Sequence, residues 1–189
     1  MAIEETVLDN SVVVISENLP GYLSAAVGVW IDVGSRDEKP ALNGISHFFE
    51  HMVFKGNAER NALEIVQDIE SRGGYINAFT TKENTCIYAK VIKNDLPLAT
   101  EIVCEMVNSS LMDERELKKE RQVIVEEIRS SEDVPEEMVH DYFSMAVWGG
   151  DSIGQPIAGE VKVVRSMGRS ELLQHQKKVN TKYRVVVSA

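Results

Sequence analysis

The sequence predicts an α+β fold in which a mixed, largely antiparallel sheet packs against helices. Segments rich in β-branched residues come first, a pair of strands around a polar turn lies in the middle, and helical patterns stand between and after them. Hydrophobic residues make up 43% of the 189 residues, so the chain can bury the core of one sizeable domain.

The expected strands are runs of apolar and β-branched residues bounded by turn residues. Pro20 and Gly21 close the first strand, and the polar sequence TKEN at 81–84 joins the central pair as a turn. The strands cover residues 11–18, 22–35, 75–80, 85–92 and 183–189. Two strands, a central hairpin and a last strand favour a sheet that is mostly antiparallel or mixed.

The expected helices show apolar residues spaced three and four positions apart, or begin at a capping residue. Asn61 and Asp113 can accept the first free amides of two helices. Pro135 suits the first turn of a third helix, and Gly56 is expected to stop the earliest one. The helices cover residues 44–57, 62–72, 95–110, 114–132, 136–148 and 170–178. The Gly-rich segment 149–160 lacks phosphate-binding spacing and is expected to form turns.

Composition and charge exclude several classes of function. The formal net charge of −10 argues against a nucleic-acid-binding surface, which needs a basic field, and would suit a basic peptide. No apolar run approaches the length of a membrane span, and the start MAIEETVLDN resembles neither a signal nor a transit peptide. Cys86 and Cys104 lack C-x-x-C spacing, which indicates reduced thiols. We therefore expect a cytoplasmic protein with no nucleic-acid or membrane partner.

The helix at 44–57 carries the pattern H-x-x-E-H within an otherwise apolar sequence. At about 100° per residue, His47, Glu50 and His51 share one arc of roughly 100°, while apolar residues fill the opposite side. Two histidines one turn apart can hold one zinc ion, and a glutamate beside them can act on a water. The alternative is a pair of core histidines satisfied by backbone groups.

A catalytic zinc needs a third protein ligand, and the acidic helix at 114–132 offers carboxylates. On its helical wheel Glu120 and Glu127 lie two turns apart at the edge of the buried face, whereas Glu126 points to solvent. Two interpretations of Glu120 stay open. It forms a pair with a lysine or arginine, or it is a carboxylate that supports a metal ligand.

Three segments, GISHFFEHMVFKG (44–56), GGYINAFT (73–80) and ERQVIVEEI (120–128), resemble the pitrilysin/insulinase family, the M16 peptidases. The resemblance runs from about Asn10 to the C-terminus and is greatest to the mitochondrial-processing-peptidase branch and its bacterial homologues. It implies that residues 1–189 form an N-terminal zinc-binding catalytic domain with the M16 peptidase, or LuxS-like, fold.

The resemblance also implies roles for individual residues. One Zn²⁺ per domain would be held by His47, His51 and Glu127, with Glu50 as the general base. Glu120, the second catalytic candidate, matches a glutamate that supports the site. The family lays its substrate against an edge strand, with main-chain hydrogen bonds giving affinity. The residues matching that strand are Asn77, Ala78, Phe79 and Thr80.

The expected function is that of a zinc metalloendopeptidase acting on extended peptides or unfolded proteins. Members of the family carry a second, similar domain after this one, so we expect a C-terminal domain or a partner subunit, in a homo- or heterodimer. The alternatives are a non-catalytic homologue that acts as a structural or regulatory subunit, and an isolated domain that is inactive. Because every position that matches a metal ligand of the family carries a suitable residue here, the interpretation as an enzyme is favoured.

Overall fold

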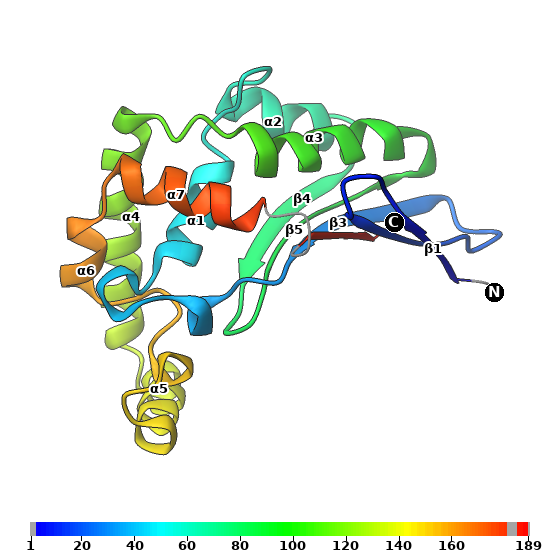
Figure 1. Ribbon diagram of the computed structural model, residues 1–189. Helices are drawn as coiled ribbons and strands as arrows, with labels where there is room; N and C mark the ends of the chain where they lie inside the picture. The colour runs from blue at the N-terminus through cyan, green and yellow to red at the C-terminus, as the bar shows by residue number, and fades with distance from the viewer. Residues whose placement is uncertain (1–2, 181–184, 189) are drawn as a thin grey trace.

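The computed structural model describes residues 3–180 and 185–188, and within them six strands form one sheet in the order β1-β2-β6-β3-β5-β4 (Figure 1). Only β2 and β6 pair in parallel; the other neighbours are antiparallel. The strands are β1 (Ile3–Val7), β2 (Val13–Glu17), β3 (Ser24–Ile31), β4 (Tyr75–Thr80), β5 (Thr85–Ile92) and β6 (Val185–Ser188). The α+β class with a mixed, largely antiparallel sheet is therefore confirmed.

Helices cover one face of this sheet and one end of it (Figure 1). They are α1 (Ile45–Val53), α2 (Ala62–Glu70), α3 (Leu96–Ser109), α4 (Glu114–Glu132), α5 (Pro135–Trp148), α6 (Val161–Ser166) and α7 (Arg169–Val179). Helix α3 packs on β3 and β5, while α1 lies against β4, α4 and α7. Helix α1 therefore connects the sheet to α4 and α7.

The core is built around the apolar face of α1. Phe48, Phe49, Met52 and Val53 have no exposed surface, and they belong to one continuous cluster with the inner faces of the strands. Burying a side chain of this size contributes roughly 1.5–3 kcal/mol. The helix therefore cannot shift without a large loss of packing.

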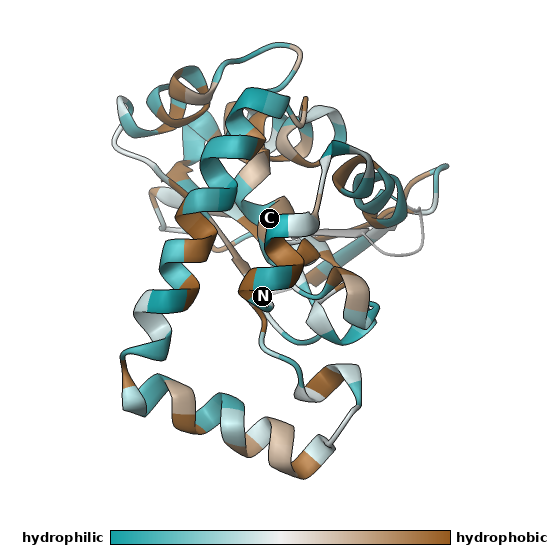
Figure 2. Cartoon of the chain, turned by 90° about the vertical axis from the view of Figure 1, so that its left-hand side faces the viewer, coloured by the Kyte–Doolittle hydropathy of each residue, from teal (hydrophilic) through white to brown (hydrophobic). Residues whose placement is uncertain are grey.

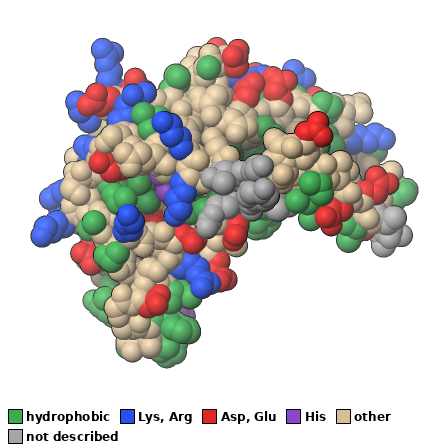
Figure 3. Space-filling view, viewed as in Figure 1, with side chains coloured by type: hydrophobic (Ala, Val, Ile, Leu, Met, Phe, Trp, Pro, Cys, Tyr) green, Lys and Arg blue, Asp and Glu red, His purple; other side chains and the backbone are tan. Residues whose placement is uncertain are grey.

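Helix α5 projects from the rest of the molecule at the lower end of α4 (Figure 1). Hydrophilic and hydrophobic residues alternate along it (Figure 2), and none of its residues is buried. Tyr142, Phe143 and Trp148 are more than half exposed, and hydrophobic side chains gather on this part of the surface (Figure 3). No described helix is both long enough and apolar enough to cross a membrane.

One β-strand and one α-helix were not predicted from the sequence. Strand β1 forms a hairpin with β2, but all five of its residues are exposed, so no alternation of buried and exposed residues marks it. Helix α6 spans only six residues, too few to establish a helical period. The helix expected at 44–57 ends at Val53, before Gly56. Residues 183, 184 and 189 of the last expected strand lie outside the described residues.

His175 on α7 is buried beside Phe49, with 5.5 Å between the ring centroids. Its Nε2 atom has no hydrogen-bond partner among the described residues. Burial, with a further contribution from Lys178, lowers the pKa of His175 to about 4 from the ordinary 6.5. The imidazole is therefore neutral in the folded protein at pH 7.

We predict that His175 makes the fold sensitive to acid. Its folded-state pKa lies below its unfolded-state pKa, so this contribution to stability is complete above pH 6.5 and is lost as the pH falls toward 4. Between pH 7 and pH 5 the loss is about 2 kcal/mol. Urea unfolding of His175→Leu should show a smaller drop between these pH values than the wild type. His140→Gln, at an exposed position, should keep the full drop. Equal drops in His175→Leu and the wild type would contradict the assignment.

Candidate metal centre

The start of α1 is fixed by a buried carboxylate. Gly44 precedes the helix with a φ of +93°, a conformation that favours glycine, and glycine has no side chain with which to cap the helix. Glu38 takes this role: its carboxylate accepts hydrogen bonds from the amides of Gly44 (2.7 Å) and Ser46 (2.8 Å) and from Nδ2 of Asn43 (3.1 Å). Burial raises the pKa of Glu38, although these hydrogen bonds oppose the change.

Helices α1 and α4 bring two imidazoles and one carboxylate together. Nε2 of His47 lies 3.5 Å from Oε1 of Glu127, and Nε2 of His51 lies 3.4 Å from its Oε2. One donor atom from each of the three residues falls within 4.8 Å of the others. The neighbouring Glu126 is exposed and pairs with Arg129 at 2.6 Å instead.

This donor set fits a zinc ion. Four ligands at about 2.1 Å from zinc lie about 3.4 Å apart in a tetrahedron, which matches the separations between Glu127 and the two histidines. Two imidazoles and one carboxylate are ligands that zinc accepts, and three protein ligands leave a fourth position open. The assignment of these residues as ligands stays a prediction.

The same three groups perturb one another electrostatically. Hydrogen bonds from His47 and His51 hold the pKa of Glu127 well below its usual range. Burial tends to lower the pKa of His51, but the carboxylates of Glu127 and Glu120 outweigh it, so the pKa is raised. Glu127 is therefore ionised at neutral pH, and His51 holds a proton more tightly than an isolated histidine.

Glu120 is buried behind His51 and contacts two partners. Its Oε2 lies 3.2 Å from Nδ1 of His51, and its Oε1 lies 2.8 Å from Nζ of Lys55. The sequence left open whether Glu120 pairs with a basic residue or supports a ligand, and the geometry includes both contacts. A carboxylate on Nδ1 leaves Nε2 of His51 to face Glu127. Lys55 lies within the helix expected at 44–57 but was not singled out, because the sequence does not show that its side chain lies beside Glu120.

Glu50 is not part of the donor cluster, and its carboxylate contacts the edge of the sheet. Its Oε2 accepts a hydrogen bond of 2.6 Å from the hydroxyl of Thr80, the last residue of β4. Within the described residues β4 is an edge strand, paired on one side with β5. The predicted general base and the predicted substrate-binding strand therefore meet at Thr80.

The four residues predicted to bind substrate have different surroundings. Ala78 is buried toward the helices, whereas Asn77 faces the opposite side of the sheet and accepts a hydrogen bond from the Ala78 amide. Phe79 packs edge-on against Trp30, at 5.6 Å between centroids, and near Tyr88. Side chains therefore alternate between the two faces of β4, and a peptide beside the strand would have to pair with its backbone.

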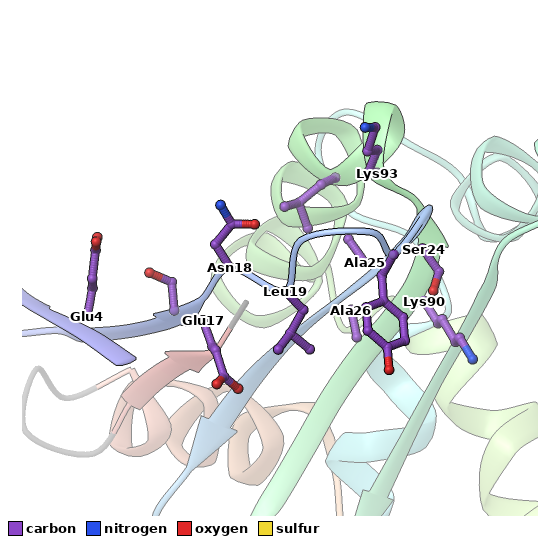
Figure 4. Close-up of a pocket in the computed structure, with 12 residues that line it drawn as sticks. Glu4, Glu17, Asn18, Leu19, Ser24, Ala25, Ala26, Lys90 and Lys93 are labelled. Carbon is purple, nitrogen blue, oxygen red and sulfur yellow. The ribbon is translucent and has the colours of Figure 1, made fainter. Parts of the chain in front are cut away.

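A cavity of about 690 Å³ is lined by residues of β1, β2, β3 and β5, of the segment between β2 and β3, and of the segment from the end of β5 to the start of α3 (Figure 4). Glu4, Glu17 and Lys90 are among the charged residues around it, and none of the candidate site residues lines it. Strand β6 pairs with Gly28–Ile31 of β3, while residues 24–27 have only β5 beside them among the described strands. The cavity therefore adds no residue to the candidate site.

The comparisons with known proteins agree with the geometry. Residues 13–161 match the family Insulinase (Peptidase family M16). The chain belongs to peptidase family M16. It is 42% identical over 187 residues to an uncharacterised zinc protease of Streptomyces coelicolor, covering 99% of this chain and 41% of that protein. It is 37% identical to the beta subunit of the mitochondrial-processing peptidase of Rattus norvegicus, covering 97% of this chain and 37% of the subunit.

Among solved M16-like structures, a protease from Helicobacter pylori superposes with a TM-score of 0.94 at 25% identity. The match covers 99% of this chain and 45% of that protein. The chain therefore spans less than half the length of each of these three relatives.

We predict that removing the carboxylate of Glu38 destabilises this M16 fold. Glu38→Ala leaves three donors at the start of α1 without their partner, and the free energy of unfolding should fall by about 2 kcal/mol. Urea unfolding followed by circular dichroism measures the change. Glu70→Ala, at an exposed position near the end of α2, should shift the midpoint little. If the two variants unfold alike, Glu38 is not the cap that holds α1.

Proposed function

We propose that this chain is the zinc-binding, catalytic part of an M16 endopeptidase that hydrolyses extended peptides. The observation that carries the proposal is that the polar residues of α1 make two different kinds of contact. His47, His51 and Glu127 bring their donor atoms close enough to hold one metal, while Glu50 on the same helix accepts a hydrogen bond from Thr80 of the edge strand. The relatives named as zinc proteases support the choice of metal and reaction class.

His47, His51 and Glu127 would hold the zinc. When bound, the metal would acidify a water and polarise the scissile carbonyl group. The carboxylate of Glu50 would accept the proton of the attacking water and deliver it to the leaving amine. Glu120, held by Lys55, would keep the ring of His51 oriented through Nδ1.

The backbone of β4 would hold the peptide substrate. Residues 75–80 pair with β5 on one side, and the opposite edge of β4 has no partner among the described strands. A substrate added there as a further strand would gain main-chain hydrogen bonds with little demand on its sequence. Its backbone would then pass Thr80, next to Glu50.

The complete peptidase would include a second domain or a partner subunit. The chain spans less than half of each reported relative, and one of these relatives is itself named as a subunit. The exposed edge of β4 and the partly exposed Glu127 leave one side of the site open to solvent. A second domain or subunit would close that side around an extended substrate.

We predict that Glu50 and His51 fail in different ways when they are replaced. In the full-length peptidase, Glu50→Gln should keep one zinc per chain and lose hydrolysis of a quenched fluorescent peptide by about 10²–10⁴-fold, the usual contribution of a general base. His51→Ala should lose the metal itself, because a donor atom is removed. Metal analysis and peptide cleavage together separate the two roles.

Glu126→Gln and His140→Ala, outside the cluster, are the matched controls. Normal cleavage by Glu50→Gln would refute the assignment of the base, and stoichiometric zinc in His51→Ala would refute the ligand set.

We also predict that zinc affinity falls as the pH is lowered from about 8 to about 6, because a metal must displace the proton of its histidine ligands. The carboxylates of Glu127 and Glu120 raise the pKa of His51 despite burial. Competition between the proton and the metal for His51 therefore begins at a pH above 6.5, the ordinary pKa of histidine. Competition with a chromophoric chelator at several pH values measures the slope. Glu120→Gln should shift the dependence to lower pH, whereas Glu126→Gln should not. A zinc affinity independent of pH in this range would contradict the prediction.

A further inference from the structure

Thr80 and Glu50 form a short hydrogen bond between β4 and α1. The distance from Oγ1 to Oε2 is 2.6 Å, within the range of a hydroxyl donating to a carboxylate. The two residues are 30 positions apart, so the bond ties the edge of the sheet to the metal-binding helix. Thr80 was expected from the sequence to contact substrate, but its hydroxyl is already engaged by Glu50.

The backbone of Thr80 is itself held firmly. It is the last residue of β4 and pairs with Thr85 of β5. The next residue, Thr81, closes the turn through a hydrogen bond of 2.8 Å from its amide to the carbonyl oxygen of Asn84. The Thr85 hydroxyl, in turn, donates to the carbonyl oxygen of Val33 at 2.9 Å. The Thr80 hydroxyl is therefore presented from a rigid position.

Glu50 needs such a restraint because of its place on α1. It lies between His47 and His51, and a free carboxylate on this arc could rotate toward the metal site and compete with Glu127. The bond to Thr80 fixes one oxygen of Glu50 on the strand side. The other oxygen then remains available for a proton.

We infer that Thr80 is a positioning residue for the general base: its hydroxyl holds Glu50 outside the metal donor set and beside the edge of β4. This inference rests on the proposed function. The strand that would align the peptide would then also align the proton acceptor, so one element would set the position of the scissile bond and of Glu50.

The test compares Thr80→Val and Thr80→Ser in the complete, zinc-loaded peptidase, with its second domain or partner subunit present. Valine keeps the β-branched shape and removes the hydroxyl, while serine keeps the hydroxyl. For Thr80→Val we expect kcat to fall about tenfold or more, in line with the loss of a hydrogen bond to a charged group, with KM within twofold of the wild type. Thr80→Ser should recover most of the kcat. Thr100→Val, which removes a hydroxyl hydrogen bond within α3, is the matched control and should leave kcat unchanged.

Two further measurements do not depend on turnover. Zinc content should stay at one per chain in Thr80→Val, because Thr80 is not a ligand. In the Glu50→Gln background, adding Thr80→Val should leave the Kd of an uncleaved peptide unchanged, because the hydroxyl does not bind substrate. A tenfold weaker peptide Kd, or loss of zinc, would overturn the inference.

Full kcat in Thr80→Val would also overturn it. That failure is distinct from failure of the proposed function, which would appear as normal hydrolysis by Glu50→Gln. With Glu50→Gln inactive and Thr80→Val fully active, only the positioning role of Thr80 would be lost.

Discussion

The structure depends on burying α1 on one broad face while one narrow arc stays polar. Phe48, Phe49 and Met52 are completely enclosed, so the rotation of the helix about its axis is set by core packing. This rotation fixes the directions in which the side chains of His47, Glu50 and His51 leave the helix. The directions of these three side chains therefore follow mainly from apolar packing. The hydrogen bonds around them adjust their final positions.

The helical period predicted much of this arrangement because it describes one face of one helix. It placed the two histidines and Glu50 on a common arc, and it separated Glu127 from the solvent-facing Glu126. The central hairpin was equally clear, since its strands and turn are adjacent in the sequence. The period of one element carries no information about which other element lies against it. The contacts of Glu120 with Lys55 and of Thr80 with Glu50 therefore could not be predicted from the sequence.

The two histidines are chemically unequal despite their shared pattern. Nδ1 of His51 faces Glu120, which Lys55 holds in turn, whereas Nδ1 of His47 is buried and has no hydrogen-bond partner among the described residues. A protonated His51 would donate one hydrogen bond from Nδ1 to Glu120 and another from Nε2 to Glu127. The two carboxylates therefore raise the pKa of His51.

The contact between α1 and α4 joins parts of the chain that are distant in sequence: His51 and Glu120 are 69 residues apart. A metal bound by both helices would act as a reversible crosslink closing a long loop. Because such a site does not exist in the unfolded chain, the binding free energy of the metal would become part of the folding free energy. The hairpin and α3 lie within that loop. Their resistance to unfolding would then follow the availability of metal, even though neither of them supplies a ligand.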